Sequence, residues 1–314
     1  MYQVDTDMIQ QRYDGLWPVM ITPFTAEGEI DYASLERLIA WYEGHGAAGL
    51  FAACQSSEIF YLSLKEREEL VRFVKGHAHV PVIASGHVSE SVWDQIEELN
   101  RMRRAGADAL IMITNRLCLP GQAGESFLPR LKMMMEHIDP EVPLGFYECP
   151  YPYKRLITLD ELRWCAESGR FAFMKDTCCD MALIRQRLQA IEGSSLSLFN
   201  ANTTTFLDSL RAGAAGFSGV MMNFHMDLYH WLWKNWREQP ERAEQVQAFL
   251  TMFSEIERQY YPVNAKYHLK AIEGVLDSAF ARVKPESGLT ETFRDEVRQL
   301  HLAARVVRDT LCQG

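Results

Sequence analysis

The sequence predicts an α/β fold, a (β/α)8 TIM barrel with a C-terminal helical extension. Short apolar runs alternate with amphipathic helical segments over most of the chain, and after about residue 225 only helical patterns follow. This alternation is typical of parallel strands joined by helices. A doubly wound open sheet is the alternative, although no G-x-G-x-x-G or P-loop motif follows the first strand. The predicted strands lie near residues 17–22, 48–53, 81–85, 108–113, 143–147, 171–174, 196–199 and 216–220.

The connections between these runs carry recognisable start and stop signals. "HGAAGLF" (45–51), "AGADALI" (105–111) and "AGAAGFS" (212–218) each end a helical pattern on glycine and enter an apolar run, as a helix C-cap before a strand does. Ser63–Glu66 and Thr158–Glu161 both have the spacing of a capping box. Leu35, Leu38, Ile39 and Tyr42 fall on one face of the first predicted helix.

We divide the chain into an N-terminal extension (1–14), a catalytic barrel (15–236) and a helical extension (237–314) that is expected to pack on the barrel. The 314 residues suit one barrel with additions. The last helices are predicted at 228–236, 243–259, 264–280 and 290–311.

Composition narrows the class of protein. The net charge of −10 disfavours nucleic acid and anionic membranes as partners. The N-terminus lacks the pattern of a signal peptide, and no apolar run approaches the roughly 18 residues that span a bilayer. The odd number of cysteines, seven, without a secretion signal, favours reduced thiols and a cytoplasmic location.

Lys175 is the sharpest candidate for chemistry. It follows the apolar run Phe171–Met174, where a barrel strand would reach the active-site face. A lysine withdrawn from water has a lowered pKa, and its free amine can form a Schiff base with a carbonyl. The alternative is a lysine that reaches out to solvent or pairs with Asp176.

The ends of neighbouring strands supply further candidates. Tyr147 could move a proton, or could be a core aromatic with a satisfied hydroxyl. "CQSSE" (54–58) offers Gln55, Ser56, Ser57 and backbone N–H groups to a small carboxylate, or is an ordinary polar loop in which Glu58 forms a cap.

Other residues carry weaker signals. Glu148, Asn115, Arg116 and 200–203 also follow strands, and His87 could point at the same mouth. His77 and His79 lack a third ligand at a useful spacing, and the adjacent Cys178 and Cys179 do not form a C-x-x-C motif, so no metal site is predicted.

Taken together, these residues resemble the dihydrodipicolinate synthase / N-acetylneuraminate lyase family of class I aldolases. The resemblance runs from about residue 15 into the helical tail. The motifs that carry it are "LWPVMITPFTAEGEID", "CQSSE", "LSLKERE", "FYECP", "MKDT" and "AGAAGFSGVMMN".

The resemblance implies a (β/α)8 barrel, commonly a tetramer built from dimers, that acts on pyruvate or on 2-keto acids that release it. It implies that Lys175 forms the Schiff base, that Tyr147 relays protons, and that Ser56, with Gln55 in place of a hydroxyl, binds the keto acid's carboxylate. Val220, in the last motif, is a further candidate for substrate contact. No cofactor or metal is implied, because the iminium itself is the electron sink.

The sequence also departs from the family pattern. Arg116 and Leu117 stand where the synthase has a tyrosine pair, and Pro152 stands where it has an arginine; Lys154 or Arg155 could substitute for that arginine. The loop "NANTTT" (200–205) lacks the acidic residues with which the lyase binds sialic acid. These departures disfavour both the synthase substrate and sialic acid. Arg116 remains a candidate to bind a second carboxylate of the substrate, and Thr203–Thr205 remain candidates to contact its hydroxyls.

The sequence therefore predicts a Schiff-base lyase or aldolase for a 2-keto acid, one derived from a sugar being an option. The alternatives are a dehydratase of a 2-keto-3-deoxy sugar acid, dihydrodipicolinate synthase itself, and a non-catalytic relative that binds a keto acid. We expect a homo-oligomer, dimer or tetramer, whose partner is the small-molecule substrate.

Overall fold

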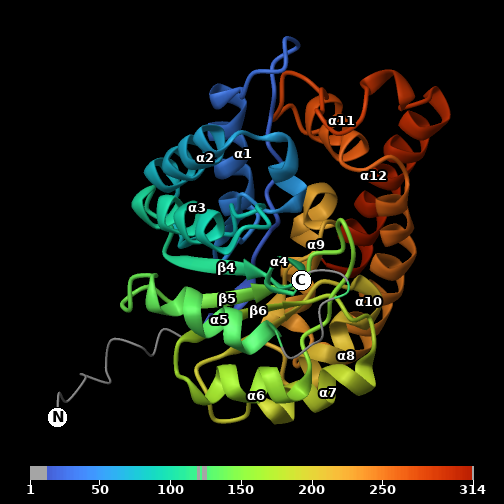
Figure 1. The fold of residues 1–314 in the computed structure, drawn as a ribbon. Helices are drawn as coiled ribbons and strands as arrows, with labels where there is room; N and C mark the ends of the chain where they lie inside the picture. The colour runs from blue at the N-terminus through green and yellow to red at the C-terminus, as the bar shows by residue number, and fades with distance from the viewer. Residues whose placement is uncertain (1–12, 119–120, 122–125, 313–314) are drawn as a thin grey trace.

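The predicted barrel is confirmed. The computed structural model describes residues 13–118, 121 and 126–312, so all but the last two residues of the proposed extension 1–14 lie outside the described part. Eight parallel strands follow one another in the order β1-β8-β7-β6-β5-β4-β3-β2, with helices around them (Figure 1). The strands are β1 Gly15–Leu16, β2 Leu50–Ala52, β3 Val82–Ala84, β4 Ala109–Ile113, β5 Leu144–Tyr147, β6 Phe171–Asp176, β7 Ser197–Asn200 and β8 Gly216–Phe217.

The barrel is closed by contacts of the first strand segment with β2 on one side and with β8 on the other. β1 is shorter and earlier than the predicted strand 17–22, but an isolated parallel bridge joins Val19 to Phe51 of β2. On the other side Gly15 pairs with Gly216 of β8. A Cβ on Gly216 would lie 1.8 Å from the carbonyl oxygen of Gly15, so this close approach requires glycine.

The helices begin and end at the predicted signals. Both capping boxes form, at the start of α2 and of α6. Gly46, Gly106 and Gly213 all have positive φ after the helices that they end. The helices up to the last strand are α1 Tyr32–Gly44, α2 Leu64–His77, α3 Val92–Arg104, α4 Thr114–Leu117, α5 Phe127–Glu136, α6 Leu159–Glu167, α7 Met181–Ala190 and α8 Phe206–Arg211.

The C-terminal segment is helical, with one correction. The helix predicted over 264–280 ends at Ala271, because the chain turns at Gly274, whose φ is +67°. The backbone N–H groups of Glu273 and Val275 fold back onto the carbonyls of His268 and Leu269. The last helices are α9 Met222–Asn235, α10 Pro240–Phe253, α11 Val263–Ala271 and α12 Glu291–Leu311, with a short 3-10 helix, η6, at Ser254–Arg258.

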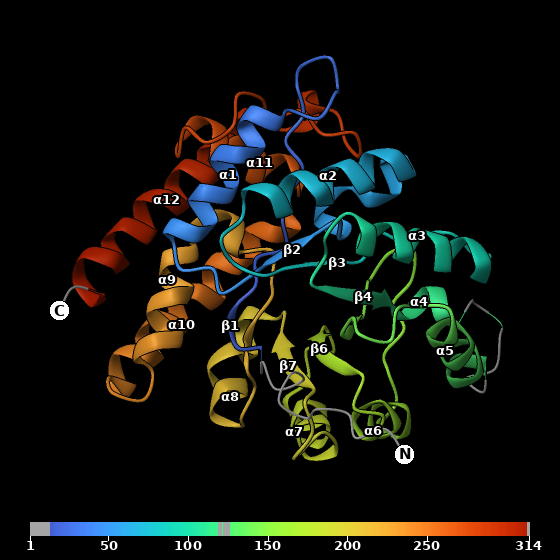
Figure 2. The ribbon, with the colours of Figure 1, turned by 90° about the vertical axis from the view of Figure 1, so that its left-hand side faces the viewer.

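The extension packs beside the first helix of the barrel. In Figures 1 and 2, α1 and α11 both lie in the upper part of the molecule, and the turn that follows α11 contacts α1. Arg37 of α1 forms an ion pair with Asp277, and the Trp41 indole of the same helix donates to Glu273. In the described part of the chain, no helix is both long enough and apolar enough to cross a membrane.

Aromatic side chains fill the barrel interior. Phe173 of β6 stacks on Phe199 of β7, with 4.3 Å between ring centroids, and meets Trp17 and Phe51 edge-on. All four are buried. Side chains of alternate residues on a strand point to opposite faces, so this inward row also directs Lys175, two residues after Phe173, toward the barrel mouth.

Candidate active site

A cavity of about 460 Å³ opens where the strands end. Most of its wall comes from the carboxyl ends of β2, β5, β6, β7 and β8, the face on which barrel enzymes carry their active sites. Its volume suits a small-molecule ligand. The lining residues used below are Gln55, Ser56, Phe60, Tyr147, Lys154, Lys175, Cys179, Asn202, Val220, Glu257, Arg258, Tyr261 and Lys284.

Lys175 is a buried amine in this cavity. The prediction that the strand ends at Met174 is wrong, because β6 continues to Asp176 and Lys175 lies inside it. The side chain is only 4% exposed, and its Nζ has no hydrogen-bonding or ion-pair partner among the described residues. Burial lowers the pKa of Lys175 from 10.5 to about 8. A substantial fraction is therefore a free amine, and thus a nucleophile, near neutral pH.

Tyr147 lies against Lys175. The two residues are register partners across β5 and β6, and the Lys175 Nζ is 4.3 Å from the centroid of the Tyr147 ring. The Tyr147 hydroxyl donates a 3.3 Å hydrogen bond to Gln55 Oε1, which also accepts from the Cys149 thiol. Burial raises the pKa of Tyr147 well above its usual value of 10, so the phenol keeps its proton at neutral pH.

Ser56 is held by a residue of the C-terminal extension. The Tyr261 hydroxyl donates to Ser56 Oγ at 2.8 Å and accepts from Asn223 Nδ2 at 3.3 Å. The Asn223 amide oxygen in turn accepts from the Tyr42 hydroxyl. This chain of hydrogen bonds fixes the Ser56 hydroxyl beside the cavity, where it can donate to a ligand oxygen while it accepts from Tyr261.

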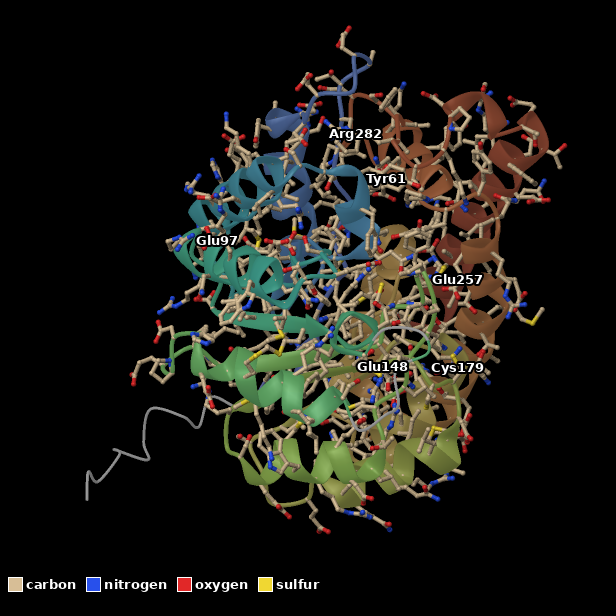
Figure 3. The ribbon with its side chains drawn as sticks, in the orientation of Figure 1. Tyr61, Glu97, Glu148, Cys179, Glu257 and Arg282 are labelled. Carbon is tan, nitrogen blue, oxygen red and sulfur yellow. The ribbon has the colours of Figure 1, made fainter. Side chains whose placement is uncertain are left out.

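Glu257 is the one carboxylate among the described cavity residues that has no hydrogen-bonding partner. It comes from η6 and is labelled in Figure 3, close to Cys179 at the cavity mouth. Burial raises the pKa of Glu257 from 4.5 to about 7, although Arg258 and Lys175 oppose the shift. The other acid of the lining, Glu58, is ion-paired with the buried Lys266. Glu257 can therefore exist as a neutral acid at physiological pH.

A buried ion cluster fixes the two strands that carry Tyr147 and Lys175. The residue after each of them, Glu148 just beyond β5 and Asp176 at the end of β6, points outward and binds the guanidinium of Arg187 on α7. All three side chains are 0% exposed. Glu148, a candidate for chemistry in the sequence, thus stabilises the site from behind and does not line the cavity.

Ser57 and Glu58 maintain the turn after β2. The Ser57 hydroxyl donates to the carbonyl of Met20 at 2.7 Å and accepts from the N–H of Cys54. Ser57 does not line the cavity, in contrast to the prediction of substrate contact. Glu58 accepts from the N–H groups of Arg282 and Val283 as well as from Lys266, which is the capping alternative.

Three further candidates lie outside the cavity. Arg116 is buried, only 7% exposed, with its guanidinium 5.3 Å from the centroid of the Phe60 ring that separates it from the ligand space. The His87 Nε2 accepts from the N–H of Ile113, and burial lowers its pKa to about 4, so His87 supports the wall in neutral form. The Asn115 amide donates to three carbonyls of the loop after β5, at Cys149, Tyr151 and Tyr153.

The loop after β7 reaches the cavity through Ala201 and Asn202. The Thr203 hydroxyl pairs with that of Tyr229, and the Thr205 N–H donates to Asn202 Oδ1, so the threonines act in local capping and not as predicted contacts to substrate hydroxyls. The Asn200 amide binds the hydroxyls of Thr205 and Ser209.

Lys154 and Arg155, the two basic residues that follow Pro152, point in different directions. Lys154 lines the cavity and donates to the carbonyl of Thr177. Arg155 turns away, pairs with Glu161 and lies over the Phe127 ring. Of the two proposed substitutes for the synthase arginine, only Lys154 is therefore near a ligand.

Sequence reasoning missed Tyr261, Glu257 and Lys284. They lie more than 70 residues beyond Lys175, in a segment whose local pattern predicts only amphipathic helix. The adjacent tyrosines before Pro262 interrupt that pattern and were the one local signal of an unusual turn.

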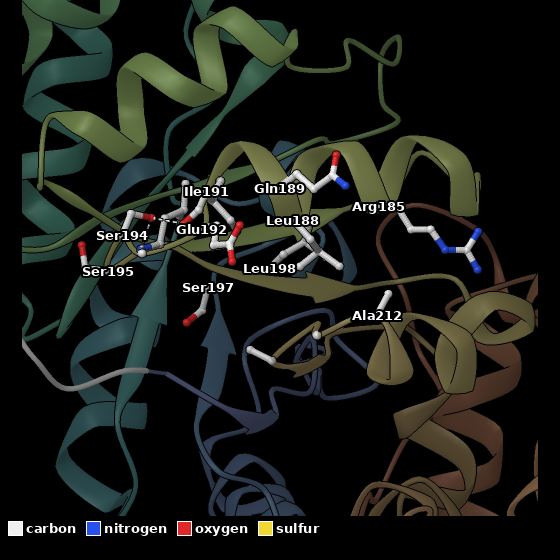
Figure 4. Close-up of a pocket in the computed structure, with 14 residues that line it drawn as sticks. Arg185, Leu188, Gln189, Ile191, Glu192, Ser194, Ser195, Ser197, Leu198 and Ala212 are labelled. Atoms are coloured by element: carbon white, nitrogen blue, oxygen red, sulfur yellow. Dashed lines mark hydrogen bonds between the residues drawn. The ribbon is translucent and has the colours of Figure 1, made fainter.

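A larger pocket, about 740 Å³, lies at the other end of the barrel. Its wall includes Ser194–Leu198, Ala212, Gly213 and Ala215, in the segments of β7 and β8, together with Arg185 and Gln189 of α7 (Figure 4). Its lining contains no buried titratable side chain. The chemistry-bearing groups belong to the smaller cavity, on the face where barrel enzymes react their substrates.

The lowered pKa of Lys175 predicts a pH profile. Below a pKa of about 8 the free-amine fraction, and so the rate of Schiff-base formation with pyruvate, should rise about 10-fold per pH unit and then level off. Stopped borohydride trapping at pH 6 to 10 measures this rate. A rate that still rises tenfold between pH 9 and 10 would contradict the burial argument.

Comparison with known proteins places the chain in context. The model of the dihydrodipicolinate synthetase family matches residues 12–303. A 4-hydroxy-tetrahydrodipicolinate synthase of Methanosarcina acetivorans is 25% identical over 215 residues, which cover 68% of this chain and 72% of the relative. One of Ruegeria pomeroyi is 30% identical over 213 residues, 67% and 71% of the two chains.

Solved structures share the fold. Dihydrodipicolinate synthase DapA-2 of Bacillus anthracis superposes with a TM-score of 0.84 at 18% identity, over 93% of this chain and 98% of that one. YagE of E. coli K12, a prophage protein of the dihydrodipicolinic acid synthase family crystallised with pyruvate, gives 0.81 at 21% identity, over 96% and 99%. At these identities the likeness concerns the fold alone.

Proposed function

Because the chain belongs to the dihydrodipicolinate synthetase family, we propose that it is a Schiff-base lyase or aldolase that cleaves a 2-keto acid to pyruvate. The observation that carries this proposal is the buried, unpaired Lys175 amine beside the Tyr147 phenol in the cavity. A cytoplasmic location and a homo-oligomeric state, dimer or tetramer, are part of the same proposal.

The reaction begins with the Lys175 amine attacking the keto carbon. Tyr147 gives its proton to the carbinolamine oxygen, which leaves as water and forms the iminium. Ser56 and Gln55 hold the substrate carboxylate, through the Ser56 hydroxyl, the Gln55 amide and neighbouring N–H groups. Val220 contributes an apolar side chain to the wall of the cavity.

The iminium then accepts the electron pair of the bond that breaks. In the lyase reaction, C3–C4 breaks as the proton of the C4 hydroxyl goes to Tyr147, and an aldehyde departs. The remaining enamine is protonated at C3, and water releases pyruvate and the free Lys175 amine. Atoms and electrons balance without a further oxidant or reductant.

A dehydratase of a 2-keto-3-deoxy sugar acid is the second candidate, and Glu257 favours it. A carboxylic acid with a pKa of about 7 can protonate a departing hydroxyl and then return as a base. We assign this proton donation to Glu257 in dehydration, where it protonates the leaving hydroxyl. In cleavage, where Tyr147 takes the proton of the C4 hydroxyl, Glu257 would orient that hydroxyl by a hydrogen bond.

The wall of the cavity suits a second anionic group. Lys154, Lys284 and Arg258 line the cavity, whereas Arg116 and Pro152 do not line it and so do not supply the cation of the synthase pattern. These residues support a dicarboxylic or sugar-derived keto acid over the substrate of dihydrodipicolinate synthase. A non-catalytic keto-acid binder would have no need of the Lys175 and Tyr147 pair.

Borohydride reduction in the presence of pyruvate tests the proposal. The intact protein should gain the mass of pyruvic acid less one oxygen atom, because the imine forms with loss of water and is then reduced. Without borohydride the adduct should be lost on dialysis. If neither pyruvate nor any other small 2-keto acid gives an adduct, the proposed chemistry is wrong.

Glu257→Gln is expected to leave Schiff-base formation intact but to slow the later step in which the substrate is cleaved or dehydrated. The adduct with pyruvate should form as before, whereas turnover of sugar-derived keto acids should fall about 10²- to 10⁴-fold, the usual contribution of a positioned acid. The measurement is product release by NMR over a panel of such acids. Glu255→Gln, an exposed acid of the same 3-10 helix, is the matched control. Equal turnover in the two variants would remove Glu257 from the mechanism.

A further inference from the structure

Three side chains of the C-terminal extension converge away from the barrel mouth. They are His268 on α11, Glu273 on the turn that follows, and His301 on α12. In the described part of the chain, this is the one group of at least three histidine, cysteine or acidic side chains whose ligand atoms come together, all within 4.8 Å of one another.

The two histidines share one oxygen. The His268 Nε2 is 3.3 Å from Glu273 Oε1, and the His301 Nδ1 is 3.9 Å from the same oxygen. His268 is only 2% exposed, yet neither of its ring nitrogens has a hydrogen-bonding partner among the described residues. Its close approach to Glu273 thus lacks hydrogen-bond geometry, and a buried imidazole without a partner is costly.

These separations are close to those of a metal site. Zinc bonds of about 2.0–2.1 Å in a tetrahedron put neighbouring ligand atoms about 3.4 Å apart. The separation of His268 Nε2 and Glu273 Oε1, 3.3 Å, already has this value. His301 Nδ1 is 3.9 Å from the same oxygen, and all three ligand atoms lie within 4.8 Å of one another, so the His301 side chain has to move toward both partners to complete the site. A hydrogen bond to Glu273 Oε1 would provide a partner for only one of the two imidazoles. A metal ion between the three side chains would bind a ring nitrogen of both His268 and His301.

The surroundings support a bound cation. The other carboxylate oxygen, Glu273 Oε2, accepts from the Trp41 indole at 3.4 Å, which orients the carboxylate as outer partners of metal ligands do. The nearby Arg308 is neutralised by Asp227. His301 and Glu273 are partly exposed, at 27% and 24%, so an ion and a water ligand have a path from solvent.

We propose that His268, Glu273 and His301 form a binding site for a divalent transition metal, with zinc as the best-fitting ion and water as the fourth ligand. The site joins α11, its following turn and α12. It has no part in the Schiff-base reaction, since α11 separates it from Tyr261 and the cavity, and its role is to fasten the extension that carries Tyr261 and Glu257.

Cobalt binding to the untagged full-length protein tests the site. One equivalent of Co²⁺ should give the visible absorption of a four- or five-coordinate ion, Zn²⁺ should displace it, and Zn²⁺ should raise the melting temperature. His301→Ala, at a partly exposed position, should weaken Co²⁺ binding more than about 100-fold, and Trp41→Phe about 10- to 100-fold, the usual cost of losing an outer partner.

His79→Ala is the matched control, because His79 pairs with Glu43 and, in the described part of the chain, belongs to no group of three side chains that could hold a metal. This variant should bind Co²⁺ like the unchanged protein. Absence of the cobalt spectrum at one equivalent, or unchanged binding in His301→Ala, would overturn the proposal. Neither outcome bears on the adduct with pyruvate, so the two proposals fail separately.

Discussion

Lys175→Ala is expected to abolish the exchange of pyruvate methyl protons with deuterated water. That exchange requires the enamine, which forms only on the Lys175 amine in the proposed mechanism. Removing a covalent nucleophile costs on the order of 10⁶-fold in rate, so the exchange signal in proton NMR should fall to the uncatalysed level. The assay needs pyruvate only, and therefore does not depend on knowing the natural substrate.

Lys154→Met is the control for this variant. Lys154 also lines the cavity, but its amine donates to the carbonyl of Thr177. It should retain the exchange reaction and the reducible adduct. Exchange that persists in Lys175→Ala, or disappears in Lys154→Met alone, would assign the chemistry to another amine.

Arg187→Met is expected to lower the free energy of unfolding by about 3–5 kcal/mol, the typical cost of removing one partner from a buried ion cluster. The change leaves Glu148 and Asp176 buried without their cation, at 0% exposure. Since these carboxylates anchor the strand ends next to Tyr147 and Lys175, adduct formation should also become slower at temperatures where the protein is still folded. Urea unfolding followed by fluorescence measures the first effect.

Arg185→Met, on an exposed position of the same helix, should change the free energy of unfolding by less than about 0.5 kcal/mol. A similar small change in Arg187→Met would mean that the two carboxylates take up protons at little cost. In that case the cluster does not hold the strand ends.

The sequence predicted those features that depend on local pattern. The capping box at Ser63, the C-cap glycines such as Gly106 and the alternation of strands with helices follow from residue types at short spacing, which is why they agree with the structure. Lys175 and Tyr147 were found for a similar reason. Each closes an apolar strand, and the ends of parallel strands share one face of a barrel.

The rest depends on contacts between distant segments. No local sequence pattern indicates that Tyr261 reaches Ser56, 205 residues away, or that Phe60 lies between Arg116 and the cavity. Likewise His268 and His301 come together only because α11 and α12 pack side by side. The helix predicted to continue to residue 280 ends at Ala271, because the backbone N–H groups of Glu273 and Val275 bond back to the carbonyls of His268 and Leu269 at the turn.

The most direct test of the account is the position of the trapped adduct. After borohydride reduction with pyruvate, the protein is digested and the modified peptide is sequenced by mass spectrometry. We predict one modified side chain, Lys175, at one equivalent per chain, with Lys154, Lys284 and Lys266 unmodified. An adduct on one of those lysines in place of Lys175 would contradict the central claim that the buried amine of β6 carries the reaction.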